Sequence, residues 1–205
     1  MTKATPLTFS TINFNEEKEQ ARAYITEAVH KGESVVPYVV VYKYLNPAAV
    51  LYFPPNTQEY SRSEHILDAA IFVAASKSDM SKLTIEASVP ASELGLKEET
   101  PDGMVDTLLM VYCADIGTAI AAVPYRINDD GTIHWYDFEP VSRTDSGIFD
   151  SLTDLNSFTL LQFALPSQIV PFKAAIGLLL ENGFKISYLD PFTEDNFSFN
   201  HVIPV

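Results

Sequence analysis

The sequence predicts an α+β protein with a mostly antiparallel sheet, in one or two layers, and two main helices. The stretch 107–138 reads as three consecutive strands joined by short turns, which would form a central three-stranded meander. Two other segments, about 15–31 and 167–182, show helical patterns of apolar residues. Further β-prone runs lie on both sides of the meander.

The first helix is expected at about 15–31. Asn15 is a residue type that caps helices, and the glutamates that follow it suit the positive end of the helix dipole. Gly32 is suited to the left-handed conformation that ends many helices. A weaker alternating pattern at 7–14 predicts a short strand before this helix.

A β-hairpin is expected next, from strands at 35–44 and 49–53. The first run is rich in β-branched and aromatic residues, and Pro54 and Pro55 stop the second. Pro37 lacks an amide hydrogen, so it belongs at the start of its strand or on a sheet edge. Three tyrosines share one face of the first strand: Tyr38, Tyr42 and Tyr44.

The segment 63–76 fits two structures. Ser63 could cap a helix, but the apolar residues that follow also suit a buried strand. We favour the strand, because 82–89 alternates cleanly between apolar and polar residues and residues 78–81 could join the two as a hairpin.

The register of the central meander follows from its second turn. Residues 128–131 are Asn, Asp, Asp and Gly, which tolerate the backbone of a tight loop, so Ile127 is expected to pair with Thr132. Trp135 then lies on the opposite face from the tyrosines, and a slip of one residue would exchange the faces. Both faces are largely apolar, so we expect cover on both sides. The face that carries the tyrosines includes the candidate interaction residues Tyr112, Tyr125, His134 and Tyr136.

The last part of the chain is expected to contain a strand at 158–165, the second main helix at 167–182, and strands at 185–189 and 196–203. The helix is apolar nearly all round. Such a helix is either deeply buried or packed against a partner chain, which makes Leu179 a candidate contact residue.

Composition sets broad limits on the protein. A chain of 205 residues with 47% apolar residues is most simply one globular domain, 1–205. The net charge of −14 comes from 27 acidic residues against 13 lysines and arginines. This acidic surface disfavours direct binding to nucleic acid or to an anionic membrane and would suit a basic protein partner, although charge kept for solubility explains it too.

Cysteine usage and the first residues predict a location. Cys113 is the single cysteine, so no disulfide can form within the chain and a reducing compartment is expected. The first fifteen residues contain no apolar core of signal-peptide length, and the longest apolar run, 35–42, is too short to span a bilayer. The sequence therefore predicts a soluble, cytoplasmic protein.

No motif in the chain indicates a particular reaction. Cys113 and His134 are displaced along the predicted sheet, and polar residues precede the protease-like triplet 145–147. Asp129 and Asp130 are explained by the turn they form, and the four histidines lack the spacing of a zinc site. We therefore predict no catalytic residue, no metal site and no cofactor.

The preferred functional prediction is a non-enzymatic protein-interaction or assembly component, bound to a second copy of the chain or to a basic protein. The alternative is a small-molecule-binding module whose pocket is lined by tyrosines. A hydrolase with scattered carboxylates and His134 comes third. The candidate interaction residues are Tyr38, Tyr42, Tyr44, Tyr112, Tyr125, His134, Tyr136 and Leu179.

Overall fold

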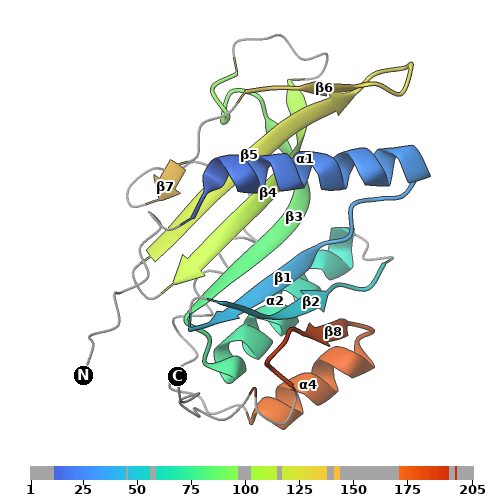
Figure 1. Cartoon of the computed structure of the whole chain (residues 1–205). Helices are drawn as coiled ribbons and strands as arrows, with labels where there is room; N and C mark the ends of the chain where they lie inside the picture. Colours follow the sequence, from blue (N-terminus) through green and yellow to red (C-terminus); the bar gives the residue numbers. More distant parts are fainter. Residues whose placement is uncertain are drawn as a thin grey trace. The chain divides into compact units, whose positions relative to one another are not determined.

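The computed structural model has the predicted α+β fold with a mostly antiparallel sheet (Figure 1). Its contacts group the chain into two compact units, and whether these form one domain stays a prediction. No helix in the described residues is both long and apolar enough to cross a membrane. The structure describes residues 12–44, 46–55, 59–96, 103–114, 117–137, 141–143, 171–193 and 197.

The first unit is a sheet with one helix on its face. Its strands have the order β6-β5-β4-β3, and β7 also pairs with β5. The predicted meander at 107–138 is confirmed, because β4, β5 and β6 are hydrogen-bonded neighbours in sequence order. The unit holds α1 (Phe14–Lys31), most of β3 (Met80–Pro90) and β4 (Met104–Ala114), β5 (Gly117–Ile127), β6 (Ile133–Trp135) and β7 (Val141–Arg143).

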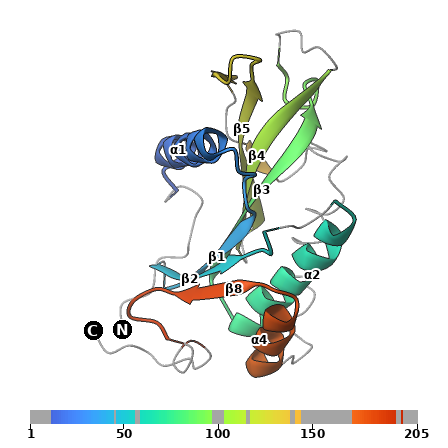
Figure 2. The ribbon, with the colours of Figure 1, turned by 90° about the vertical axis from the view of Figure 1, so that its right-hand side faces the viewer.

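The N-cap of helix α1 lies two residues before the predicted one. The side chain of Asn13 accepts a hydrogen bond from the Glu16 amide at 3.4 Å, so Asn13 is the N-cap and the prediction of Asn15 is wrong. Gly32 ends the helix in the left-handed conformation, at φ 65°, as predicted. The helix lies across one face of the sheet (Figures 1 and 2), where the edge of the Phe14 ring meets Tyr112, with ring centres 5.7 Å apart.

The β5–β6 hairpin is shifted by one residue from the predicted register. Ile127 pairs with Ile133, not with Thr132, so the prediction is wrong. The physical reason lies in the loop: Gly131 has φ 80°, and Asp130 Oδ1 accepts hydrogen bonds from the Thr132 amide at 2.9 Å and from its hydroxyl at 2.6 Å. These contacts hold Thr132 at the loop's end, where its carbonyl accepts the Asn128 amide.

The second unit combines a small sheet with two helices. The β1–β2 hairpin is antiparallel, as predicted, and β8 adds to β2, so the strand order is β1-β2-β8. Helices α2 and α4 lie side by side on the same side of this sheet (Figure 2). The unit holds β1 (Tyr38–Lys43), β2 (Asn46–Tyr52), α2 (Glu59–Ser76), α4 (Phe172–Glu181) and β8 (Lys185–Tyr188).

The segment 63–76 is part of helix α2, so the favoured prediction of a strand is wrong. Apolar residues recur in this run at a spacing that fits a buried helix face as well as a buried strand. Lys77, with φ 51°, follows the helix, and the Asp79 amide then bonds to the Tyr42 carbonyl at 3.0 Å, which replaces the expected hairpin. The buried side chains of the helix include Ile66, Ala69, Ala70, Phe72 and Val73.

The remaining predicted elements divide into three groups. The strands predicted at 82–89 and 185–189 are confirmed by β3 and β8. Helix α4 spans 172–181 of the predicted 167–182, and the residues before 171 lie outside the described part. The strands predicted at 7–14, 158–165 and 196–203 lie outside it as well, except for residues 12–14 and 197.

Candidate interaction surfaces

Helix α4 presents an unusual outer side to solvent. Ala175, Ile176 and Leu179 recur at helical spacing and are buried, which defines the inner side. On the side away from these residues, Leu180 is 57% exposed and Leu178 is 36% exposed, and because they are two residues apart they lie at its two edges. We call this opposite side the α4 outer face, and its residues are Lys173, Ala174, Gly177, Leu178, Leu180 and Glu181.

The inner side of α4 is firmly attached to the second unit. The Phe172 ring packs on Phe72 of α2, with ring centres 5.6 Å apart. At the other end, the Asn182 side-chain amide donates to the Asp68 carboxylate of α2 at 2.6 Å. Because both ends are held, the position of the α4 outer face is set by the fold of its unit.

Leu179, the predicted contact residue of α4, is fully buried in its own unit. The leucines on either side of it are the ones that a partner could reach. The signal in the sequence was the helical phase of Ala175, Ile176 and Leu179, which separates inner from outer positions.

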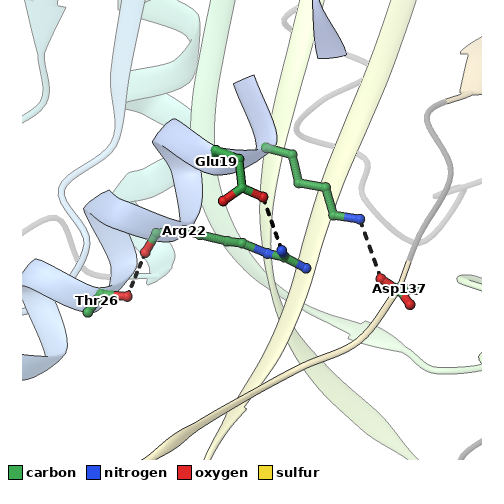
Figure 3. A network of polar contacts seen from close by, with 5 residues as sticks. Glu19, Arg22, Thr26 and Asp137 are labelled. Carbon is green, nitrogen blue, oxygen red and sulfur yellow. Dashed lines mark hydrogen bonds and ion pairs between the residues drawn. The ribbon is translucent and has the colours of Figure 1, made fainter. Parts of the chain in front are cut away.

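A second surface lies where α1 passes β6 in the first unit. The Arg22 guanidinium sits 5.5 Å from the centre of the Trp135 ring and also contacts Glu19 at 3.1 Å. Lys18 forms an ion pair with Asp137 at 3.6 Å (Figure 3). These charged groups therefore have partners within the first unit. The contact between Arg22 and Trp135 joins α1 to β6.

The predicted tyrosines of the first unit are inside it. Tyr112, Tyr125 and Tyr136 are at most 3% exposed. The Tyr125 hydroxyl donates to the Glu86 carboxylate. Burial is the main cause that raises the pKa of Tyr125 above its usual value, and the hydrogen bond to Glu86 raises it further. Glu86 is one of the polar residues of the alternating 82–89 run, and the sequence analysis did not predict this pair.

The register of β6 separates the other predicted residues of this unit. Tyr125 pairs with Trp135, whereas His134 pairs with Arg126, so Tyr125 and His134 lie on opposite faces. The prediction that they share a face is therefore wrong. His134 instead packs edge-on against Tyr136, with ring centres 4.6 Å apart.

The tyrosines of the second unit gather around the β1–β2 hairpin. Tyr38 lies opposite Tyr52 on β2, with ring centres 6.3 Å apart. Tyr44 lies just past the end of β1, is half exposed, and donates its amide hydrogen to the Asp79 carboxylate. The Tyr42 carbonyl accepts a hydrogen bond from the amide of the same aspartate. Two hydrogen bonds therefore join Asp79 to the end of β1.

Lys43 contacts the aromatic core of the second unit. Lys43 Nζ donates to the Phe197 carbonyl and lies 4.4 Å from the centre of the Phe197 ring. Burial lowers the pKa of Lys43, and the charge of Asp79 opposes this shift. Phe197 also packs against Phe72 and Phe172, so the lysine belongs to an aromatic core.

Groups that could carry chemistry are scattered over the described residues. Cys113 is buried on β4. Within the part of the chain that the structure describes, no three His, Cys, Asp or Glu side chains lie close enough to hold a metal ion. A comparison with known proteins matched no family model, no curated protein and no solved structure.

Proposed function

We propose that this protein is a non-enzymatic component of a protein assembly and binds a protein partner through the α4 outer face. The single observation that carries the proposal is the exposure of Leu178 and Leu180 on a helix whose other side is already packed. Fully burying a leucine side chain contributes about 1.5–3 kcal/mol, so covering these two would favour association.

Three differences favour α4 over the other candidate surfaces. The charges beside Trp135 are paired within the first unit. The tyrosines that would line a small-molecule pocket are buried, and the hydroxyl of Tyr125 is bound to Glu86. On α4, by contrast, Leu178 and Leu180 keep part of their apolar surface in contact with water.

A photo-activated cross-linking residue in place of Leu180 tests the proposal in the cells that make the protein. We expect an adduct with a protein at position 180. The matched control carries the same residue in place of Ile127, which is 47% exposed on β5, and should give none.

The cross-link must also depend on the surface. Adding Leu178→Lys to the Leu180 probe should remove the adduct, because a charge in the contact leaves the partner's apolar side chains without cover. Equal labelling from positions 180 and 127, or an adduct that survives Leu178→Lys, would refute binding through this face.

A further inference from the structure

We infer that the partner of the α4 outer face is a second copy of the same chain, in an antiparallel two-fold pair that crosses at Gly177. The inference rests on the proposed function and names its partner. It is carried by the arrangement of charge on α4, which is complementary to itself when one copy is reversed.

Lys173, Gly177 and Glu181 form one ridge of the helix. They are spaced four residues apart, so they lie along a single i±4 row at the middle of the outer face. Gly177 is the midpoint, with Lys173 one turn before it and Glu181 one turn after it. The two charges are about 12 Å apart along the helix axis at 1.5 Å per residue, too far to pair with one another.

A two-fold axis at Gly177 brings these charges together between copies. When two such helices run antiparallel, Lys173 of each copy meets Glu181 of the other, which gives two ion pairs. Rows of the i±4 type pack against each other at a crossing angle of about 50°, the commonest geometry for helix pairs. Within the described residues, neither Lys173 nor Glu181 forms an ion pair in its own chain.

The glycine lets the two backbones approach. A Cβ built at Gly177 would meet no atom within 4 Å, so nothing inside the chain requires a glycine there. Glycine in a helix costs about 1 kcal/mol relative to alanine. A helix crossing at position 177 explains the glycine, because the missing side chain leaves room for the facing helix.

The leucines supply the apolar part of the contact. Leu180 and Ala174 lie three residues on either side of Gly177, and Leu178 lies at the margin of the face. One lysine and one glutamate give the face no net charge. A basic partner would gain little from such a face, whereas a reversed copy matches both charges.

The acidity of the whole chain opposes self-association. Two chains of net charge −14 repel one another at long range. At about 0.15 M salt the screening length is roughly 8 Å, which weakens this repulsion while contacts within the interface persist. Measurements of association therefore belong at physiological ionic strength.

Sedimentation velocity of the full chain over a range of concentrations tests the pair. The wild type should move from 22.7 kDa towards twice that mass as its concentration rises. Lys173→Glu and Glu181→Lys should each weaken association about tenfold, because each converts two attractive pairs into repulsive ones. The matched charge controls are Lys185→Glu on β8 and Glu33→Lys after α1, which lie off the ridge and should associate like the wild type.

A mixture of the two charge-reversal variants tests the antiparallel arrangement directly. An equimolar mixture of Lys173→Glu and Glu181→Lys should form a heterodimer, because both crossed pairs then join opposite charges. The double variant should recover the homodimer for the same reason. A mixture that stays as weak as its components would overturn the antiparallel arrangement.

Gly177→Gln separates association from folding. Glutamine favours a helix more than glycine does, and the space around position 177 is open, so the thermal midpoint of the monomer should hold or rise. Association should be lost, because the side chain fills the crossing point. Unchanged association would overturn the inference.

The two proposals fail in different ways. If the wild type stays at 22.7 kDa up to about 1 mM, self-pairing is refuted, since even a millimolar dimer would register there. A cross-link from position 180 to a different protein would then sustain the proposed function without this partner. Loss of every specific cross-link at position 180 refutes both.

Discussion

Helices α1 and α4 differ in how their charged and apolar surface side chains are paired. On α1 the charged groups pair along the helix, with Lys31 and Glu27 at 2.5 Å and Arg22 and Glu19 at 3.1 Å. On α4, Leu178 and Leu180 are exposed, and the two charged residues are eight positions apart. These charges of α1 are thus paired within one chain, whereas we propose that those of α4 pair with a second copy.

The two helices also differ in how their ends are capped. Asn13 caps α1 with its side chain, and Gly32 closes the other end in the left-handed conformation. Pro171 precedes α4 and provides no side-chain cap. Isolated short helices are marginal in water, so α4, of ten residues, depends on packing from outside itself more than α1 does.

The largest expected effect separates the two sides of α4. Leu179→Ala should lower the free energy of unfolding by about 2–5 kcal/mol, because it opens a cavity at a fully buried position. Leu180→Ala, one residue away, should change it by less than about 0.5 kcal/mol while still weakening association. Urea unfolding followed by circular dichroism measures both, and equal losses would contradict the assignment of the two sides.

The next effect concerns the cap that α1 has and α4 lacks. Asn13→Ala should cost about 1 kcal/mol of stability, since the Glu16 amide loses its acceptor. Asn13→Asp keeps an acceptor oxygen at the same place and should retain most of the stability. If the two variants unfold at the same denaturant concentration, the cap observed at Asn13 contributes nothing.

A smaller effect is expected where α1 is fastened to β6. Arg22→Met keeps the aliphatic stem but removes the cation above Trp135, at a cost of about 0.5–1 kcal/mol. A double-mutant cycle with Trp135→Leu isolates this contribution. A coupling energy of zero would mean that the contact between the Arg22 guanidinium and the Trp135 ring contributes nothing to stability.

The sequence predicted what depends on local chemistry and missed what depends on contacts made elsewhere. Gly32 and the loop at 128–131 were recognised from residue type, but the register turned on the Asp130 side chain holding Thr132. Residues 63–76 fit a helix or a strand equally well, because an alanine-rich apolar run satisfies both patterns.

The candidate site was only half predictable for the same reason. The apolar character of 167–182 indicated a helix that is buried or bound to a partner, and it drew attention to Leu179. Which leucines stay in water depends on how α2 packs against α4, and that contact joins segments about a hundred residues apart. Lys173 and Glu181 lie symmetrically about Gly177 in the sequence, but this symmetry indicates a contact only once the structure shows that all three residues lie on the outer side of α4.

The smallest expected effect tests whether charges on α1 act within the chain. The hydrogen bond and charge of Lys31 hold the pKa of Glu27 below its usual value of 4.5. A carboxyl with a lowered pKa in the folded state adds stability above its unfolded pKa, and this is lost as the pH falls through the folded value. Glu27→Gln should therefore lower the thermal midpoint slightly at neutral pH, with the difference fading below about pH 4.

The matched variant on α4 is Glu181→Gln, because Glu181 forms no ion pair within the described part of its own chain. Its monomer should melt like the wild type at neutral pH, and the change should appear in the sedimentation experiment as weaker association. Glu27→Gln should leave association unchanged. If Glu181→Gln destabilises the monomer as much as Glu27→Gln does, the charges of both helices act within the chain and the contrast between α1 and α4 disappears.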